Sequence, residues 1–185
     1  MIKEIIAYNK AFATEGKGAH YTTSKYPNRK LAIVTCMDTR LTEMLPAALG
    51  IKNGDAKIIK DAGGMIVHPF GAVVRSLLIS IYELGVENIM VIGHTDCGVQ
   101  HMDVPEMMEK MREEGIDEEV FHQMRYYGID FDQWMGGFDC VETAVRESVE
   151  LLEHHPLIPK KVSIYGFVID TETGLLKQVA GKSAE

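Results

Sequence analysis

Three short segments of this chain carry side chains that can bind a metal ion and act beside it. Their sequences are CMDTR at residues 36–40, KDAGG at 60–64 and HTDCG at 94–98. Two thiolates and one imidazole, from Cys36, Cys97 and His94, form a ligand set that suits zinc. Three protein ligands leave the fourth tetrahedral position for water, as in catalytic rather than structural zinc sites. The segments therefore predict a zinc-bound hydroxide at neutral pH.

His94 and Cys97 are the more specific part of this pattern, because a His-x-x-Cys pair can hold one metal ion from a single turn. Cys36 taken alone would more often be a packed core residue, since free cysteine is among the most buried residue types. The nearby pair favours the ligand interpretation, with Cys36 completing the set from a neighbouring strand. Cys140 has no ligand partner close to it in the sequence and is interpreted as structural.

Asp38 and Arg40 lie close to the first thiolate and can act on the water. A carboxylate two residues from a ligand can accept a hydrogen bond from that water and orient it. Arg40 can hold Asp38 ionised and away from the metal through a two-point hydrogen bond. If this pair opened, Asp38 could itself become the fourth zinc ligand. The plainer alternative is an exposed ion pair that contributes less than about 1 kcal/mol.

The composition indicates one compact domain over residues 1–185. The chain has 46% hydrophobic and 25% charged residues, as globular proteins do, and at this length it can bury a single core. A formal net charge of -8 disfavours binding to nucleic acid or to an anionic membrane surface. No apolar stretch approaches the roughly 20 residues of a membrane span.

The cysteines and the N-terminus together predict a cytoplasmic location. Three cysteines are an odd number, and two of them stand in segments that need free thiolate, so a disulfide framework is not expected. The first residues mix charged and apolar types and lack the apolar core of a secretory signal. A reducing compartment suits both observations.

Apolar runs and helical stripes alternate along the first half of the chain. Short apolar runs predict strands at 31–35, 56–60 and 89–93, and a 3.6-residue spacing predicts helices at 41–49 and 73–84. Each chemical segment begins where a strand ends. All three segments should therefore meet at the carboxyl edge of one parallel sheet.

The second half of the chain has a weaker pattern. We expect a helix at 107–114, an irregular segment at 126–130 and an amphipathic helix at 141–153. Two further strands, at 163–170 and 175–179, flank a Thr-Glu-Thr-Gly turn. This arrangement predicts a C-terminal β-hairpin.

The order C-x-D-x-R, Gly-rich loop and H-x-x-C-G resembles the β-class carbonic anhydrases. The likeness runs from about residue 31 to residue 98, and more loosely to the C-terminal hairpin, and it is closest to the short prokaryotic and archaeal branch. It implies zinc on the three ligands named above, with Asp38 and Arg40 as a catalytic pair. The implied reaction is the reversible hydration of CO₂ to bicarbonate and a proton.

The same resemblance implies the fold and the assembly. The fold would be α/β, with a central, mainly parallel four-stranded sheet flanked by helices and an additional C-terminal edge strand. Residues 1–30 would form an N-terminal helical arm that packs on the partner in a homodimer or a higher homo-oligomer. Tyr82 matches a position that lines the substrate pocket of the family. Main-chain N–H groups near Gly63 are expected to help place this small-molecule substrate.

This chain departs from many members of the family around the second chemical segment. Asp-Ala-Gly-Gly at 61–64 stands where many relatives carry Asn-Ala-Gly-Asn, and an insertion-like His-Pro-Phe-Gly follows at 68–71. These differences touch the substrate pocket rather than the zinc ligands. Hydrolysis of carbonyl sulfide or carbon disulfide at the same site is therefore an alternative activity.

Two further questions stay open at this point. The chain could be a non-catalytic zinc-binding homologue, although a structural site would have no use for Asp38 and Arg40. His68 could be a proton shuttle or a turn residue, and His101 could be a proton shuttle or a solvent-facing residue.

Overall fold

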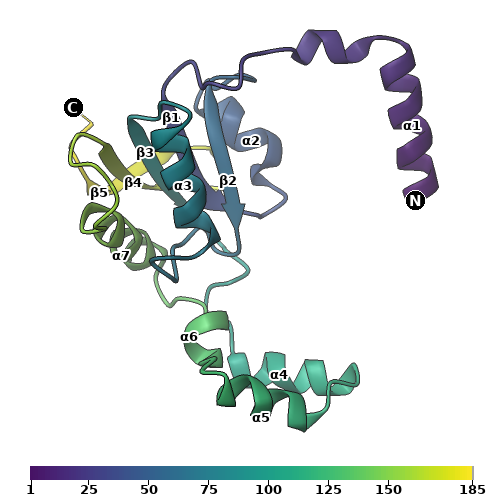
Figure 1. The fold of residues 1–185 in the computed structure, drawn as a ribbon, viewed down its shortest axis with the longest axis vertical. Coiled ribbons are helices and arrows are strands. Elements are labelled where there is room, and N and C mark those ends of the chain that lie inside the picture. The colour runs from purple at the N-terminus through teal and green to yellow at the C-terminus, as the bar shows by residue number, and fades with distance from the viewer. Residues whose placement is uncertain (185) are drawn as a thin grey trace.

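The computed structural model describes residues 1–184, and its centre is a five-stranded sheet with helices on both faces (Figure 1). The strands are β1 (Leu31–Cys36), β2 (Ala56–Asp61), β3 (Asn88–His94), β4 (Ser163–Ile169) and β5 (Leu176–Gly181). Their order is β2-β1-β3-β4-β5, in which the first four are parallel and β5 is antiparallel to β4. The predicted fold class, including the C-terminal edge strand, is confirmed.

Each face of the sheet packs against helices. The helices α3 (Ala72–Tyr82) and α7 (Val141–Glu153) cover one face, and α2 (Leu41–Ala48) covers the other (Figure 1). Successive side chains of a strand point to opposite faces, so Val34 packs with α3 and α7 while Ile33 packs with α2. Burial on both faces explains why the central strands β1 and β3 are nearly continuous apolar runs in the sequence.

Two glycines allow α7 to lie close to the sheet. A Cβ added to Gly93 of β3 would lie 2.6 Å from Val141 Cγ2. A Cβ added to Gly166 of β4 would lie 2.8 Å from Val145 Cγ1 and 2.9 Å from Val149 Cγ2. These separations are well inside the favourable carbon–carbon distance of about 3.5–4.0 Å. A larger residue at either position would push α7 away from the strands.

The predicted elements of the sheet layer agree with the structure to within two residues at every end. The helix predicted at 141–153 has the same bounds as α7, and the helix predicted at 73–84 corresponds to α3 at 72–82. The predicted hairpin is formed by β4 and β5. Asp170 shapes its turn, because its carboxylate accepts hydrogen bonds from the main-chain N–H groups of Glu172 and Thr173.

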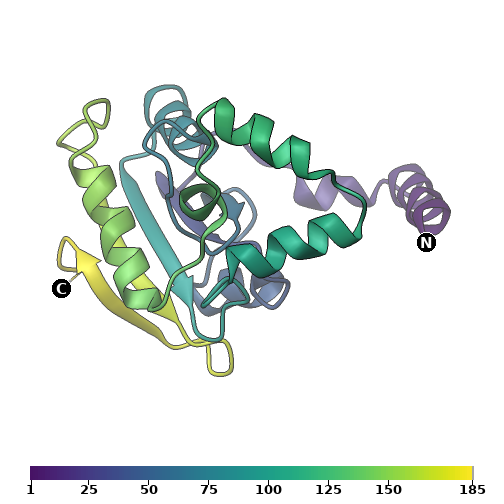
Figure 2. The ribbon, with the colours of Figure 1, turned by 90° about the horizontal axis from the view of Figure 1, so that it is seen from below.

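A helical excursion leaves the sheet after β3 and lies beyond the carboxyl edge of the parallel strands (Figures 1 and 2). It consists of α4 (Val104–Glu113), α5 (Glu118–Tyr126) and α6 (Phe131–Met135). These helices bury a small apolar cluster of their own, formed by Val104, Met108, Phe121 and Phe131. The excursion is therefore a separately packed layer over the strand ends.

Sequence analysis anticipated only part of this excursion. The helix expected at 107–114 is α4, and residues 127–130 are irregular as expected, but α5 and α6 were not predicted. Each of these two helices begins with an aspartate whose carboxylate accepts a main-chain N–H of the first turn. The bonds are Glu119 N to Asp117 and Gln133 N to Asp130. Such N-caps stabilise the first turn of these short helices.

The N-terminal arm extends away from the sheet (Figure 1). It contains α1 (Ile2–Thr14) and the short 3₁₀ helix η1 (Lys17–Tyr21), and neither buries a residue. Ile2, Ile5 and Ile6 form a stripe along α1 and are 50–61% exposed. Over residues 1–184, every helix is too short or too polar to cross a bilayer.

Candidate metal centre

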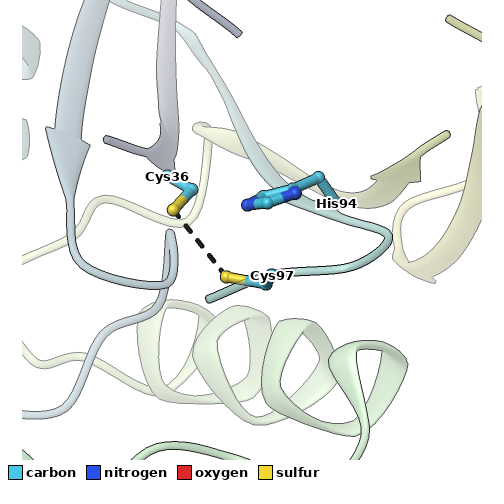
Figure 3. Close-up of side chains that lie close together, drawn as sticks. All are labelled: Cys36, His94 and Cys97. Atoms are coloured by element: carbon cyan, nitrogen blue, oxygen red, sulfur yellow. Dashed lines mark hydrogen bonds between the residues drawn. The ribbon is translucent and has the colours of Figure 1, made fainter. Parts of the chain in front are cut away.

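The three predicted metal ligands meet at the carboxyl ends of two neighbouring strands. Cys36 is the last residue of β1, His94 is the last residue of β3, and Cys97 lies in the turn that follows. Because β1 and β3 are parallel and adjacent, their ends share one edge of the sheet. Figure 3 shows the two sulfur atoms and the imidazole ring facing one space.

The geometry of this cluster fits a tetrahedral metal ion. Cys36 Sγ and Cys97 Sγ are 3.8 Å apart, and the three ligand atoms all lie within 4.8 Å of one another. Two thiolates on a tetrahedral zinc ion, each bonded at about 2.3 Å, would also be about 3.8 Å apart. All three residues are buried, with exposed fractions of 6% or less. The predicted Cys-His-Cys set therefore forms a single compact donor group.

His94 has a buried ring nitrogen without a partner among the described residues. Its Nδ1 lies 2.9 Å from the carbonyl oxygen of Thr95, which assigns the proton to Nδ1 and leaves the Nε2 lone pair free. Nε2 is buried and has no hydrogen-bond partner among the described residues. Metal-ligating histidines commonly donate their second N–H to a carbonyl in this way. The buried lone pair thus points to a cation.

Burial also acts on the thiols. It raises the pKa of Cys97 above its ordinary value, and the neighbouring Cys36 adds to the effect. Two buried thiolates 3.8 Å apart would repel each other without a cation between them. A divalent ion at this position removes that repulsion and stabilises the deprotonated forms.

Asp38 and Arg40 form a two-point ion pair at the edge of the cluster. Arg40 donates from Nε to Asp38 Oδ1 at 3.0 Å and from Nη2 to Oδ2 at 2.9 Å, and its main-chain N–H donates to Oδ1 at 2.8 Å. These hydrogen bonds lower the pKa of Asp38 to about 2, so its carboxylate is ionised at neutral pH. Asp38 Oδ2 lies 4.0 Å from His94 Nε2. The carboxylate therefore faces the position that a metal ion and its water would occupy.

A cavity of about 880 Å³ adjoins the ligands and lies between the sheet and the helical excursion. On the sheet side its wall includes Cys36, Asp38 and Asp61. On the excursion side its wall includes Met107 and Trp134. Sequence analysis missed these two residues, which lie far from the ligands along the chain, and no local spacing marks them.

The described residues that line the cavity include neither of the two predicted substrate-pocket residues. Gly63 has a φ of +87° and follows Ala62, which does line the wall. Tyr82 lies elsewhere, because its hydroxyl donates to the carbonyl oxygen of Leu157 at 2.9 Å. Among the described residues that line the cavity, Tyr82 is absent.

The two remaining histidines of interest also differ in position. His68 lines the cavity, and its Nδ1 accepts the main-chain N–H of Phe70 at 3.1 Å. His101 lies outside this cavity, exposed, with Nδ1 3.4 Å from Asp139 Oδ1. Of the two candidates for proton transfer, only His68 therefore borders the space beside the ligands.

Asp61 is a further polar residue of the cavity wall whose surroundings sequence analysis did not anticipate. Its carboxylate accepts the main-chain N–H groups of Gly64 and Met65, and burial raises its pKa to about 6. Oδ1 is buried and has no partner among the described residues. Asp61 thus shapes the Gly-rich loop that borders the strand ends.

Gly64 brings this loop against the first ligand strand. A Cβ at Gly64 would lie 2.7 Å from Cys36 N and 2.9 Å from Thr35 C, and its φ is +66°. Gly50 has a similar φ of +60° but open space around it. A comparison of substitutions at Gly64 and Gly50 therefore distinguishes the cost of a left-handed backbone from the cost of a steric clash.

We predict that Gly64→Ala is much more destabilising than Gly50→Ala. The left-handed backbone alone should cost Gly50→Ala about 1 kcal/mol, and the added clash should bring Gly64→Ala to roughly 2–4 kcal/mol. Chemical denaturation of both variants measures the two losses. Equal losses would show that the loop does not press on the strand end.

Comparison with known proteins agrees with this geometry. The sequence profile of the carbonic anhydrase family matches residues 31–176. The chain is 47% identical over 176 residues to the Bacillus subtilis protein named "Putative carbonic anhydrase YtiB", with coverage of 95% of this chain and 94% of that protein. It is 32% identical over 158 residues to a carbon disulfide hydrolase of Acidithiobacillus thiooxidans, with coverage of 81% and 77%.

A solved structure shows the same fold along nearly the whole chain. The crystal structure of β-carbonic anhydrase isoform I from Trichomonas vaginalis superimposes with a TM-score of 0.88 at 34% identity, covering 99% of both chains. This structural likeness, the family profile and the Cys-His-Cys cluster all indicate the same family. The chain belongs to the carbonic anhydrase family of enzymes, in its β class.

Proposed function

We propose that this enzyme uses zinc to catalyse the reversible hydration of CO₂ to bicarbonate and a proton. The observation that carries the proposal is the ionised Asp38 carboxylate, held by Arg40 with its Oδ2 4.0 Å from the free nitrogen of the ligand His94. A purely structural zinc site would not need a carboxylate aimed at its open position. This arrangement argues against a non-catalytic homologue.

The donor set supports zinc as the metal. Two thiolates and one imidazole suit zinc and leave one position open for water. Bound there, zinc would supply the Lewis acidity that makes water a nucleophile at neutral pH. We also infer a reducing cytoplasmic location, because Cys36 and Cys97 must stay reduced to bind the metal.

The residues around the metal position have distinct roles in this proposal. Asp38 Oδ2 accepts a hydrogen bond from the reacting water and turns its lone pair toward the cavity. Arg40 keeps Asp38 ionised and prevents it from moving onto the metal. Main-chain N–H groups near Gly63, which follows the cavity-lining residue Ala62, help to place the substrate. The product bicarbonate and its proton leave through the same cavity.

A second candidate reaction is the hydrolysis of carbonyl sulfide or carbon disulfide. The cavity wall near the ligands carries apolar side chains, among them Met37, Met65 and Trp134. Such a wall suits uncharged linear molecules generally. A relative with 32% identity is named carbon disulfide hydrolase. The same metal centre could serve either substrate class, so the assay must include both.

We also propose that α1 packs on a second copy of this chain, as the resemblance implies. Its stripe of Ile2, Ile5 and Ile6 is exposed in the single chain and lies away from the sheet (Figure 1). Apolar stripes of this kind are normally buried against another surface. A homodimer would provide that surface.

The first prediction concerns the metal. The purified wild-type protein should retain about one zinc ion per chain, as expected for a three-residue zinc site. Cys97→Ala should lose most of it, whereas Cys140→Ala should retain it because Cys140 lies outside the cluster. Mass spectrometry of the dialysed proteins measures the content. Equal zinc in both variants would contradict the assignment.

The second prediction concerns Asp38. Asp38→Asn should keep its zinc but lower kcat for CO₂ hydration about 100-fold, because an amide cannot act as the charged acceptor. Asp55→Asn is the matched control, since Asp55 is 16% exposed, Asp38 is 17% exposed, and Asp55 pairs with Arg29 away from the ligands. Stopped-flow CO₂ hydration measures both variants.

The same preparations should be assayed with carbonyl sulfide and carbon disulfide. Zinc-loaded wild type that releases hydrogen sulfide but does not hydrate CO₂ would replace the leading proposal with the alternative. Zinc-loaded wild type that is inactive on all three substrates would support the non-catalytic interpretation.

The third prediction concerns the arm. Wild type should have at least twice the monomer mass by light scattering, and Ile5→Lys/Ile6→Lys should shift it toward the monomer by charging the stripe. Ala11→Lys is the control, because Ala11 lies on the opposite side of α1 and is also exposed. A monomeric wild type would refute the proposed dimer.

A further inference from the structure

We propose that Asp96 is a positioning residue that holds Arg40, and through it Asp38, in the orientation needed for reaction. Asp96 lies between the ligands His94 and Cys97 and does not itself face the metal position. Its side chain is 86% exposed. The inference rests on the proposed function, because it assigns Asp96 to the same reaction.

Arg40 is held from two sides. One edge of its guanidinium donates to Asp38, at 3.0 Å from Nε and 2.9 Å from Nη2. The adjacent edge, which shares Nη2, donates to Asp96, at 2.8 Å from Nη1 to Oδ2 and 2.7 Å from Nη2 to the carbonyl oxygen. Since the guanidinium is rigid and planar, two anchors on different segments fix its position and its rotation.

The backbone of Asp96 takes part in this arrangement. Its φ is +53°, in the left-handed region that aspartate tolerates better than most residues. In this conformation both its carbonyl oxygen and its carboxylate reach Arg40. Asp96 therefore links the turn that carries Cys97 to the segment that carries Cys36 and Asp38.

The pair should act on geometry more than on stability. With side-chain exposures of 86% and 41%, Asp96 and Arg40 form a solvent-accessible ion pair, a class that contributes little to folding. Its effect falls instead on Asp38. Without Asp96, Arg40 and Asp38 could swing together about the end of β1, and the carboxylate would spend less time aimed at the reacting water.

The test uses the zinc-loaded, full-length protein with Asp96→Gly. Glycine keeps the left-handed turn and the carbonyl oxygen, so this variant removes only the carboxylate. We expect kcat for CO₂ hydration to fall about three- to tenfold, as for the loss of one typical hydrogen bond, with zinc content and thermal stability unchanged. Asp96→Asn should recover part of the loss, because its amide oxygen can still accept from Arg40.

The controls separate positioning from a general effect. Asp139→Asn removes another exposed carboxylate and should leave kcat unchanged. In an Arg40→Ala background, Asp96→Gly should cause no further loss, because the two residues act as one unit. An unchanged kcat in Asp96→Gly, or the same loss in both backgrounds, would overturn the inference. If Asp96→Gly loses zinc or unfolds, Asp96→Ala, which also removes the carboxylate and keeps the carbonyl oxygen, is judged by the same two criteria.

A second readout does not depend on turnover. In a crystal structure of the zinc-loaded Asp96→Gly variant, the Arg40–Asp38 pair should be displaced relative to the zinc ligands or spread over several positions. A pair that keeps its wild-type position relative to the zinc ligands would overturn the inference. This readout stands even if the zinc-loaded wild type fails to hydrate CO₂, a result that defeats the proposed function alone.

Discussion

The parallel pairing of β1 with β3 is the contact on which the metal centre depends. The paired residues run from Leu31 opposite Asn88 to Thr35 opposite Ile92. Both strands therefore end at the same edge of the sheet, and their ligand residues Cys36 and His94 face one space. A slip of one residue would turn every side chain of the strand to the other face of the sheet. Apolar packing on both faces opposes such a slip, because α2, α3 and α7 each bury one set of alternating residues.

The buried ligand atoms at the carboxyl ends of β1 and β3 require a cation. The free nitrogen of His94 is buried without a partner, and burial raises the pKa of the Cys97 thiol. The unpartnered nitrogen destabilises the folded protein, and the raised pKa keeps the Cys97 thiol protonated at neutral pH unless a cation is bound. A divalent ion bonded to these atoms satisfies the nitrogen and stabilises the thiolate. Metal binding and folding are therefore thermodynamically linked at this edge of the sheet.

Local sequence pattern is sufficient for the sheet and the ligands but not for the excursion. Cys36 and His94 can be placed because they stand at or directly after the end of an apolar run, and the hairpin can be placed from its turn. In the excursion, α5 and α6 are only nine and five residues long, too short to show a sustained helical period, and their N-caps Asp117 and Asp130 are the main local signals. No local signal marks Trp134 as part of the cavity wall, since that depends on how the excursion sits over the strands.

The excursion leaves and rejoins the body of the protein at one narrow base. Gln100 and Phe138 form an isolated bridge there, so the helices between them are an appendage whose length does not alter the sheet. The metal ligands lie at the strand ends, whereas one wall of the adjoining cavity is formed by the excursion. Evolution can therefore remodel that wall without disturbing the ligands. Such modularity gives a physical route by which one metal centre could come to serve different small molecules, as the names of its relatives suggest.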